Sequence, residues 1–397
     1  MIKKALTTIC KADVEALLTD TVRESTTLDY KQSLPKNDDD SKRDFLADVV
    51  AFANTAGGDI IYGVTERREN GKPTGEPESI NGLGGANIDQ EILRLESSIR
   101  SSIEPRVSTT KFHRVDGFVN GPVLILRVEK SYISPHMVTY KNLSRFFARG
   151  SNGNYEMDIT QIRSAFAQYE AFPERVRNFV WDRISKIIGN QSSISLPTGP
   201  KIVIHTFPQS LFDSSHQLDL RALQDKIEAF LPFHDRHLMD LRYNLDGIFK
   251  FIRAKDKSVM EYCQIFRNGA IEAVDMYQLN REDLTIKSLA FEIDIVKAAS
   301  RCITLQRQLG LQFPFFIRLS LLNVYGYRID MDVRRPADPD SYKIDREHLF
   351  LSEISILDEQ MLIENALQPL FDSVWQASGF SHSYNYDAKG VWKGKKS

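Results

Sequence analysis

The chain has few cysteines and no long apolar stretch. Its three cysteines, Cys10, Cys263 and Cys302, are odd in number, far apart and in no C-x-x-C spacing. This pattern excludes a disulfide framework and a cysteine zinc site, so we expect three free thiols. No apolar run approaches the ~20 residues of a membrane-spanning helix, and the first residues lack the apolar core and cleavage site of a signal peptide. We therefore expect a soluble, cytoplasmic protein.

A strong charge imbalance is also missing. The chain has 51 Lys+Arg and 53 Asp+Glu, a formal net charge of −2. Residues 1–160 contain 21 basic and 23 acidic residues, which leaves 30 of each for the rest. Neither part has the basic excess of a protein that binds nucleic acid without specificity. Any nucleic-acid surface must therefore be a local patch.

The composition that remains is that of an ordinary globular protein, with 42% hydrophobic and 26% charged residues. A single core stops growing at about 250–300 residues, so 397 residues predict more than one domain. The polar stretch GNQSSISLPTGP, residues 189–200, is the best candidate linker. We predict four parts: an α/β domain at 1–170, a helix and linker at 171–200, an α+β domain at 201–380 and a mobile tail at 381–397.

Local patterns predict a mixed sheet with flanking helices in the first domain. Leu28, Tyr30 and Gln32 alternate with polar residues, as in a half-buried strand. The segment 41–55 has apolar residues at helical spacing and ends at Gly57-Gly58. Further strands and helices follow in both domains, so the fold class is α/β (α+β).

Several motifs occur in order along the first 165 residues. They are Glu24-Ser25 through Asp29-Tyr30-Lys31, then AFANTAGGD at 51–59 leading to Gly63-Val64, and finally Pro135-His136 and Arg149-Gly150-Ser151. This order resembles the Schlafen-type AlbA-like domain family over about residues 20–165. The second domain resembles nothing that we recognise.

The resemblance implies a domain that acts on nucleic acid, of a kind named a DNA- or ATP-binding domain in bacteria. Animal members include RNA-cleaving enzymes with three catalytic acids, which fall here on Glu24, Asp29 and Glu66. Asp29 departs from the usual Glu, and Thr65-Glu66 stands where two acids are commoner. The family also implies a homodimer, because its animal enzymes use two related lobes, and a role in bacterial defence or stress.

The acidic residues have a chemical argument of their own. Carboxylates near one strand offer the hard oxygen ligands that Mg²⁺ or Mn²⁺ prefers. Lys31 lies two residues after Asp29 and so shares its face of the strand, where a cation would offset negative charge on a reacting phosphate. The same pair also fits an ordinary surface ion pair. Asp59 and Glu66 are seven residues apart and face opposite sides of a regular strand, so they cannot both join the site. The family resemblance favours Glu66 for the site, which leaves Asp59 to pair with a neighbouring base.

Basic and polar residues near these motifs are candidates for holding a phosphate. Arg149 offers a guanidinium fork next to backbone N–H groups, and His136 follows a proline beside a strand. A structural role for His136 remains open. Basic side chains also flank both acidic motifs as a rim for phosphate or as a solvated charged face: Lys42, Arg43, Arg67, Arg68 and Lys72.

Neither glycine-rich segment, Gly57-Gly58 or Gly82 to Gly85, has the G-x-x-x-x-G-K-(S/T) pattern of a nucleotide-binding P-loop. The first fits a helix stop with positive φ at a glycine. ATP is therefore not favoured. Two hypotheses remain: a divalent-metal-dependent endonuclease, acting on RNA or tRNA rather than DNA, and a noncatalytic module that binds DNA or a nucleotide.

Overall fold

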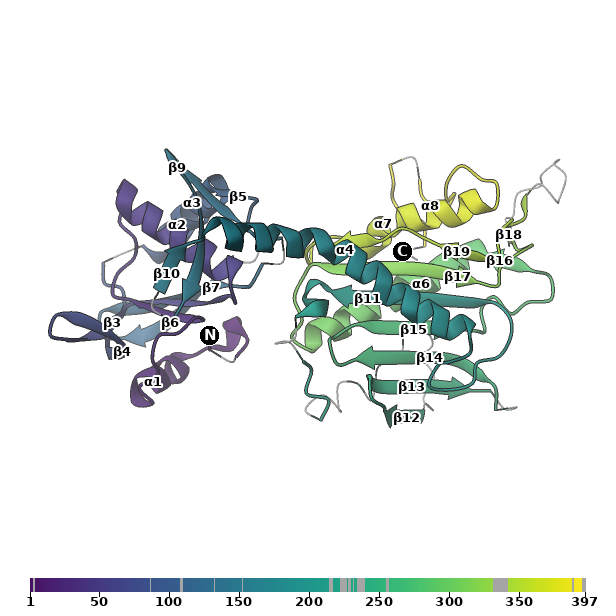
Figure 1. Cartoon of the computed structure of the whole chain (residues 1–397), viewed down its shortest axis with the longest axis horizontal. Helices are drawn as coiled ribbons and strands as arrows, with labels where there is room; N and C mark the ends of the chain where they lie inside the picture. The colour runs from purple at the N-terminus through teal and green to yellow at the C-terminus, as the bar shows by residue number, and fades with distance from the viewer. Residues whose placement is uncertain are drawn as a thin grey trace. The chain divides into compact units, whose positions relative to one another are not determined.

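The protein is described by a computed structural model that covers residues 1–397 except 3, 86, 108–109, 132, 152, 214–216, 222–226, 228–229, 231, 234–239, 255–256, 331–341, 388 and 395–397. The chain divides into two compact units, Met1–Val176 and Arg177–Ser397. Figure 1 labels their helices and strands. Each unit has its own hydrophobic core and is described separately.

Unit 1 contains a central four-stranded sheet, a second antiparallel sheet and a hairpin. The central sheet has the order β1 (Leu28–Lys31), β2 (Gly58–Tyr62), β7 (Gly121–Val128) and β6 (Thr110–Phe118), with β1 and β2 parallel. The second sheet has the order β10 (Gly153–Glu156), β9 (Leu143–Gly150), β8 (Met137–Tyr140) and β5 (Ile103–Glu104). The hairpin joins β3 (Val64–Glu69) to β4 (Lys72–Ile80).

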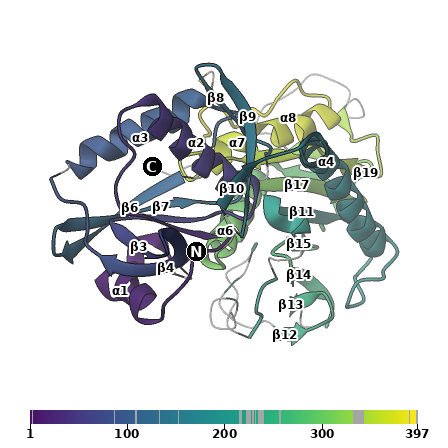
Figure 2. The ribbon, with the colours of Figure 1, turned by 60° about the vertical axis from the view of Figure 1, so that its left-hand side comes forward.

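Helices cover both faces of the central sheet, as Figure 2 shows. The helices α2 (Asp39–Asn54) and α3 (Ile88–Ser102) pack on one face with Ile60 and Tyr62 of β2. The other face carries Ile61, packed with α1 (Lys11–Thr19) and the short helix η1 (Leu6–Thr8). Because side chains alternate along β2, one strand serves two cores.

The helix α2 is fixed by its sequence at both ends. Asp38 caps its N-terminus by accepting a hydrogen bond from the Ser41 N–H. All nine residues from Phe45 to Ala53 are buried. After the helix, Gly57 adopts φ +69°, and a Cβ there would lie 2.6 Å from the backbone nitrogen of Lys130. The predicted helix stop at a glycine with positive φ is therefore confirmed.

Unit 2 is built on one large antiparallel sheet. Its strand order is β12 (Asp240–Tyr243), β13 (Gly247–Arg253), β14 (Val259–Phe266), β15 (Ile271–Asp275), β11 (Lys201–Pro208), β17 (Phe315–Leu322) and β19 (His348–Phe350), with β20 (Ile354–Ile356) also paired to β17. The strands β14 and β15 form a hairpin that turns at Asn268-Gly269. The strands β16 (Thr285–Lys287) and β18 (Arg328–Asp330) form a separate parallel pair, and Gln209–Phe212 is the short helix η2.

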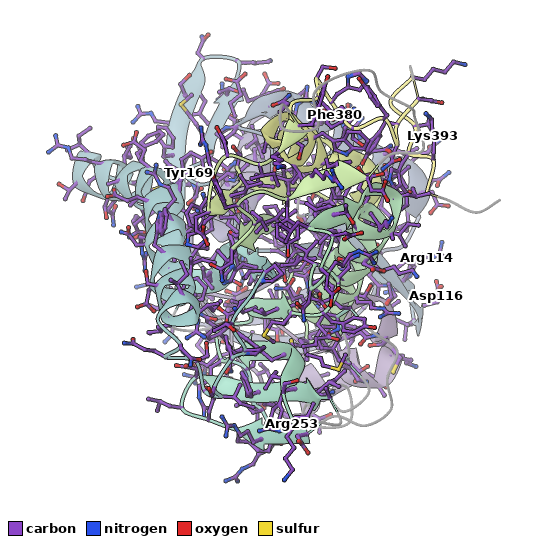
Figure 3. The ribbon with its side chains drawn as sticks, turned by 90° about the vertical axis from the view of Figure 1, so that its right-hand side faces the viewer. Arg114, Asp116, Tyr169, Arg253, Phe380 and Lys393 are labelled. Atoms are coloured by element: carbon purple, nitrogen blue, oxygen red, sulfur yellow. The ribbon has the colours of Figure 1, made fainter. Side chains whose placement is uncertain are left out.

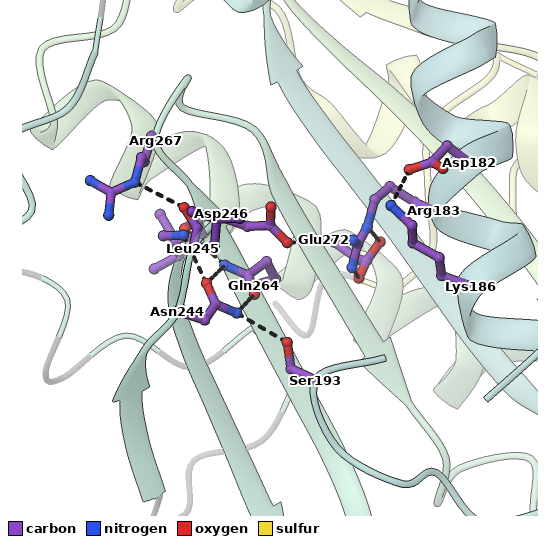
Figure 4. A network of polar contacts seen from close by, with 12 residues as sticks. Asp182, Arg183, Lys186, Ser193, Asn244, Leu245, Asp246, Gln264, Arg267 and Glu272 are labelled. Atoms are coloured by element: carbon purple, nitrogen blue, oxygen red, sulfur yellow. Dashed lines mark hydrogen bonds and ion pairs between the residues drawn. The ribbon is translucent and has the colours of Figure 1, made fainter. Parts of the chain in front are cut away.

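Among the helices of unit 2 that the structure describes, α6 (Ser288–Gln308), α7 (Ile363–Ala366) and α8 (Gln368–Ala377) pack on one face of this sheet. On the other face, residues 177–188 of α4 (Ile159–Ile188) contribute Arg183, which forms two 2.9 Å hydrogen bonds to Glu272 of β15 (Figure 4). Burial alone would raise the pKa of Glu272, but Arg183 and His205 lower it to about 2. The buried ion pair thus ties α4 to the sheet.

The unit boundary lies inside α4, not in the polar stretch predicted as a linker. The helix α4 runs continuously through Pro173 and so crosses the predicted border between the first domain, 1–170, and the helix and linker, 171–200. Within residues 189–200, Leu196 is buried and its N–H donates to Asn190, while Ser193 binds Asn244 (Figure 4). This stretch therefore belongs to unit 2, because its polar side chains bond to that unit.

The described residues 381–387 and 389–394 pack on unit 2, where the composition predicted a mobile tail. Trp392 is only 7% exposed, and its indole N–H donates to Glu292 of α6 at 3.0 Å. Ser383 donates to the same carboxylate at 2.6 Å. Figure 3 places Phe380 and Lys393 at the end of unit 2 opposite Arg253. Aromatic burial and a shared acceptor hold this segment on the unit.

The predicted fold class, a mixed α+β chain with a second α+β domain, is confirmed. The three cysteines are free thiols, as expected. In the described part of the chain, every helix is too short or too polar to cross a membrane.

Candidate functional site

The strand β1 carries the centre of the predicted site. Leu28 and Tyr30 face the core on the α1 side, so the alternation turns Asp29 and Lys31 toward α2. Asp29 is 5% exposed, and its Oδ2 lies 2.9 Å from Lys31 Nζ. The predicted pairing of these two side chains on one face of the strand is confirmed.

Arg149 forms a hydrogen bond to the other carboxylate oxygen of Asp29. The prediction that Arg149 contacts a phosphate is therefore corrected. Its Nη2 donates to Asp29 Oδ1 at 2.7 Å and to the Leu28 carbonyl at 3.2 Å. Its backbone N–H donates to Thr55 Oγ1 at 2.9 Å. The side chain of Arg149 is only 2% exposed. Its guanidinium group therefore binds a carboxylate inside the protein and is not accessible to a phosphate in solvent.

Glu24 and Glu66 meet at the backbone of Gly75. The Glu24 N–H donates to the Gly75 carbonyl at 2.7 Å, and the Gly75 N–H donates to Glu66 Oε1 at 2.6 Å. Glu24 Oε1 accepts the N–H of Tyr30 at 2.7 Å, next to Asp29. Gly75 has φ +77°, a region that favours glycine, so the hairpin can approach Glu24 closely. The structure therefore brings the three predicted acids, Glu24, Asp29 and Glu66, to one end of β1.

Electrostatics at this end favour cations. Burial, together with the nearby charges of Asp29 and Glu66, raises the pKa of Glu24 to about 7. Burial alone would lower the pKa of Lys31, but Asp48 and Asp29 raise it above its ordinary value. Lys31 therefore stays charged, and its side chain remains 40% exposed at the edge of the acidic group.

Asp48 is a member of this group that sequence reasoning missed. It lies on α2, 3.4 Å from Lys31 Nζ, and accepts a 2.7 Å hydrogen bond from Asn154. Burial raises its pKa above the ordinary value. The signal was in the sequence, because Asp48 is the one charged residue among nine consecutive buried residues, where an acid needs partners.

The AFANT motif joins segments that are distant in sequence. Asn54 Nδ2 donates to the carbonyls of His136 and Phe147, both at 2.9 Å, and Asn54 Oδ1 accepts the N–H of His136. His136 is fully buried, its Nδ1 lies 2.6 Å from the Pro105 carbonyl, and burial lowers its pKa. The prediction that His136 holds a phosphate is corrected: it is a neutral structural residue.

The remaining basic candidates lie outside the buried group. Arg67 is 56% exposed and pairs with Glu76 at 3.4 Å, whereas Arg68 is exposed on the same strand. Arg43 pairs with Asp40 one turn away on α2, next to the half-buried Lys42. Asp59 pairs with Arg127 at 2.7 Å, which confirms that it lies outside the site.

The acids offer ligands for a divalent ion without forming a complete set. Carboxylate oxygens suit Mg²⁺ or Mn²⁺, and the buried Asp29 Oδ2 faces Lys31 Nζ at 2.9 Å. Among the described residues, however, no group of three or more His, Cys, Asp or Glu is placed to hold a metal ion. Lys31 and Arg149 already balance the charge of Asp29 in this arrangement.

The fold and this site define an α/β domain with an acidic group on its first sheet strand, closed by a buried arginine. Residues 24–158 match the family model described as Schlafen, AlbA_2. Residues 24–158 of unit 1 are therefore similar to the AlbA_2 domain of the Schlafen type, and a further domain follows in the chain. A comparison with curated proteins gives no match.

Two solved structures show distant likeness. One is the N-terminal domain of an ATP-dependent DNA helicase RecG-related protein from Nitrosomonas europaea, with 21% identity and a TM-score of 0.22 over 29% of this chain and 71% of that chain. The other is the DIP2311 protein from Corynebacterium diphtheriae, with 19% identity and a TM-score of 0.25 over 37% of this chain and 29% of that chain.

Proposed function

We propose that unit 1 is a nucleic-acid-acting domain that cleaves RNA as a divalent-metal-dependent endonuclease. The Schlafen AlbA_2 match supports a nucleic-acid-related function. The observation that carries the proposal is the convergence of Glu24, Asp29 and Glu66 at one end of β1, beside a charged Lys31. RNA or tRNA is the favoured substrate, and the site of action is the cytoplasm.

The roles of the residues follow from their charge. Lys31 offsets the negative charge that develops on a phosphate oxygen during cleavage. Arg149 and Lys31 hold Asp29 in place, and Tyr30 orients Glu24 through its backbone N–H. A bound Mg²⁺ or Mn²⁺, held by Glu24, Asp29 and Glu66, would supply an activated water. The exposed Arg67 and Arg68, with Lys42 and Arg43, would contact the phosphates of the strand.

The test is cleavage of end-labelled tRNA, single-stranded RNA and duplex DNA by the purified chain, in Mn²⁺ or in EDTA. We expect cleavage of RNA in Mn²⁺ and none in EDTA. Glu24→Gln should abolish cleavage while RNA binding stays, because it removes a charge and keeps the acceptor for Tyr30 N–H. Glu69→Gln is the control, because Glu69 is an exposed acid on β3, the hairpin strand that carries Glu66. Equal cleavage by parent and Glu24→Gln would overturn the proposal.

The second candidate is a noncatalytic module that binds DNA or a nucleotide such as ATP. It is favoured by Asp29, whose two oxygens already face Arg149 and Lys31. The same assay separates the two functions, because the binding module would retain RNA or DNA in a gel without cleaving it in Mn²⁺.

We also propose that the chain acts as a homodimer, with a second AlbA_2 domain supplying the other wall of the RNA site. The chain contains one copy of the motif, and the family's animal enzymes use two lobes. Light scattering at micromolar concentration should give twice the 45.4 kDa chain mass. A monomeric mass would remove this part of the proposal.

A further inference from the structure

A cavity of about 710 Å³ lies in unit 2, far in sequence from the acidic group of unit 1. It is bounded by the segment 343–352, which contains the edge strand β19, and by the helix α8 with the following Gly379. Its volume falls in the range of about 300–1,000 Å³ typical of small-molecule sites. Nothing in the proposed cleavage reaction uses it.

Polar side chains at this cavity offer donors and positive charge. Lys343 and Arg346 line it together with a single carboxylate, Asp345. Arg346 is 75% exposed, and its nearest ion pair, with Asp345, spans 3.8 Å. His348 Nδ1 accepts the backbone N–H of Asn323, so the neutral ring carries its proton on Nε2. The lining therefore suits an anion with hydrogen-bond acceptors.

An aromatic surface adjoins these charges. Phe350 lines the cavity and is 40% exposed, which is unusual for a ring on a sheet strand. Its ring lies 4.5 Å from that of Trp181, which is 47% exposed, and 5.8 Å from that of His348. Phe350 and His348 thus line the cavity together with the two cations, and the partly exposed Trp181 ring contacts Phe350.

We infer that this cavity binds a nucleotide, with the base stacked on Phe350 and the phosphate held by Arg346 and Lys343. Aromatic rings combined with basic side chains are the arrangement by which proteins hold unpaired nucleotides, because every base has a face that stacks. The guanidinium and ammonium groups recognise the phosphate. The source is either a nucleotide of a single-stranded RNA or a free mononucleotide. The inference concerns unit 2 and does not depend on cleavage by unit 1.

The test measures binding by the full chain in EDTA, so that metal-dependent cleavage plays no part. One arm uses a fluorescein-labelled 12-nucleotide single-stranded RNA followed by anisotropy, and the other uses 5′-AMP followed by calorimetry. Hydrogen exchange with each ligand locates the contact, which we expect to slow exchange in residues 343–352 and 368–379. Protection by the RNA alone assigns a strand nucleotide, and protection by 5′-AMP as well assigns a free nucleotide.

Matched variants test the two halves of the site. Phe350→Ala should weaken binding about fivefold or more through lost stacking, and Arg346→Glu should weaken it and reduce the salt dependence by about one phosphate contact. The controls are Tyr243→Ala and Arg253→Ala, on β12 and β13 at the opposite edge of the same sheet. Because Arg346 is exposed, its variant remains informative even if Phe350→Ala lowers stability. No protection at this cavity, or equal losses in the controls, would overturn the inference.

Discussion

Arg149 is a buried cation whose nearest charge is a buried carboxylate. Replacing it with alanine leaves Asp29 without that partner, and breaking a buried ion pair costs about 3–5 kcal/mol. We expect Arg149→Ala to lower the free energy of unfolding of unit 1 by this amount. Native-state hydrogen exchange of the β1 and β2 amides measures it.

Arg145, on the same strand, is the matched control. Its side chain is 53% exposed and pairs with Glu156 at the surface. Exposed pairs contribute about 0–1 kcal/mol, so Arg145→Ala should leave exchange in β1 and β2 nearly unchanged. If both variants behaved alike, Arg149 would not be the residue that stabilises Asp29.

Glu24 should make unit 1 less stable as the pH rises. Its pKa in the folded chain, about 7, lies above the ordinary 4.5, so the folded state binds the proton more tightly. The stabilisation that Glu24 contributes is therefore complete below pH 4.5 and is lost as the pH rises through about 7. Because Glu24 is partly accessible to solvent, we expect a loss of about 1–2 kcal/mol, less than the shift alone implies. Hydrogen exchange in EDTA at pH 5 and pH 8 should show this loss, and Glu24→Gln should abolish it.

At the scale of elements, the C-terminal segment depends on one carboxylate. Glu292 of α6 is fully buried and accepts hydrogen bonds from Trp375, Ser383 and Trp392. Trp392→Ala should lower the free energy of unfolding of unit 2 by about 3–5 kcal/mol, because it empties a buried aromatic position and removes a donor. Urea unfolding measures it, and Val391→Ala, at a 56% exposed neighbour, should change little.

The elements were largely predictable because their signals are local. The apolar spacing in the segment 41–55 and the glycine at 57 each act within a few residues, whereas α2 begins at Asp39, before the predicted start at 41, and is capped by Asp38. The continuity of α4 through Pro173 and the docking of Trp392 were missed, because both depend on packing against distant residues. The site residues follow the same rule: local contacts were predicted and distant contacts were missed. Strand alternation placed Asp29 beside Lys31, whereas the Arg149 partner lies 120 residues away.

At the scale of the whole chain, the division inside α4 predicts which fragments fold. Residues 177–397 keep Arg183 with Glu272 and the buried Ile184 and Ile187, so this fragment should be folded. Residues 201–397 lose them and leave Glu272 buried without its arginine, a loss of at least about 3 kcal/mol. Circular dichroism and thermal unfolding compare the two. A 201–397 fragment as stable as 177–397 would place the boundary at the polar stretch instead.

The two units differ in tryptophan fluorescence because of where the tryptophans lie. All three tryptophans of the chain, Trp181, Trp375 and Trp392, lie in unit 2. Emission excited at wavelengths that only indole absorbs therefore reports on unit 2 alone, and unit 1 is dark. A tryptophan placed at Phe52, whose ring lies 4.4 Å from the Arg149 guanidinium, would give unit 1 a fluorophore of its own beside the acidic group.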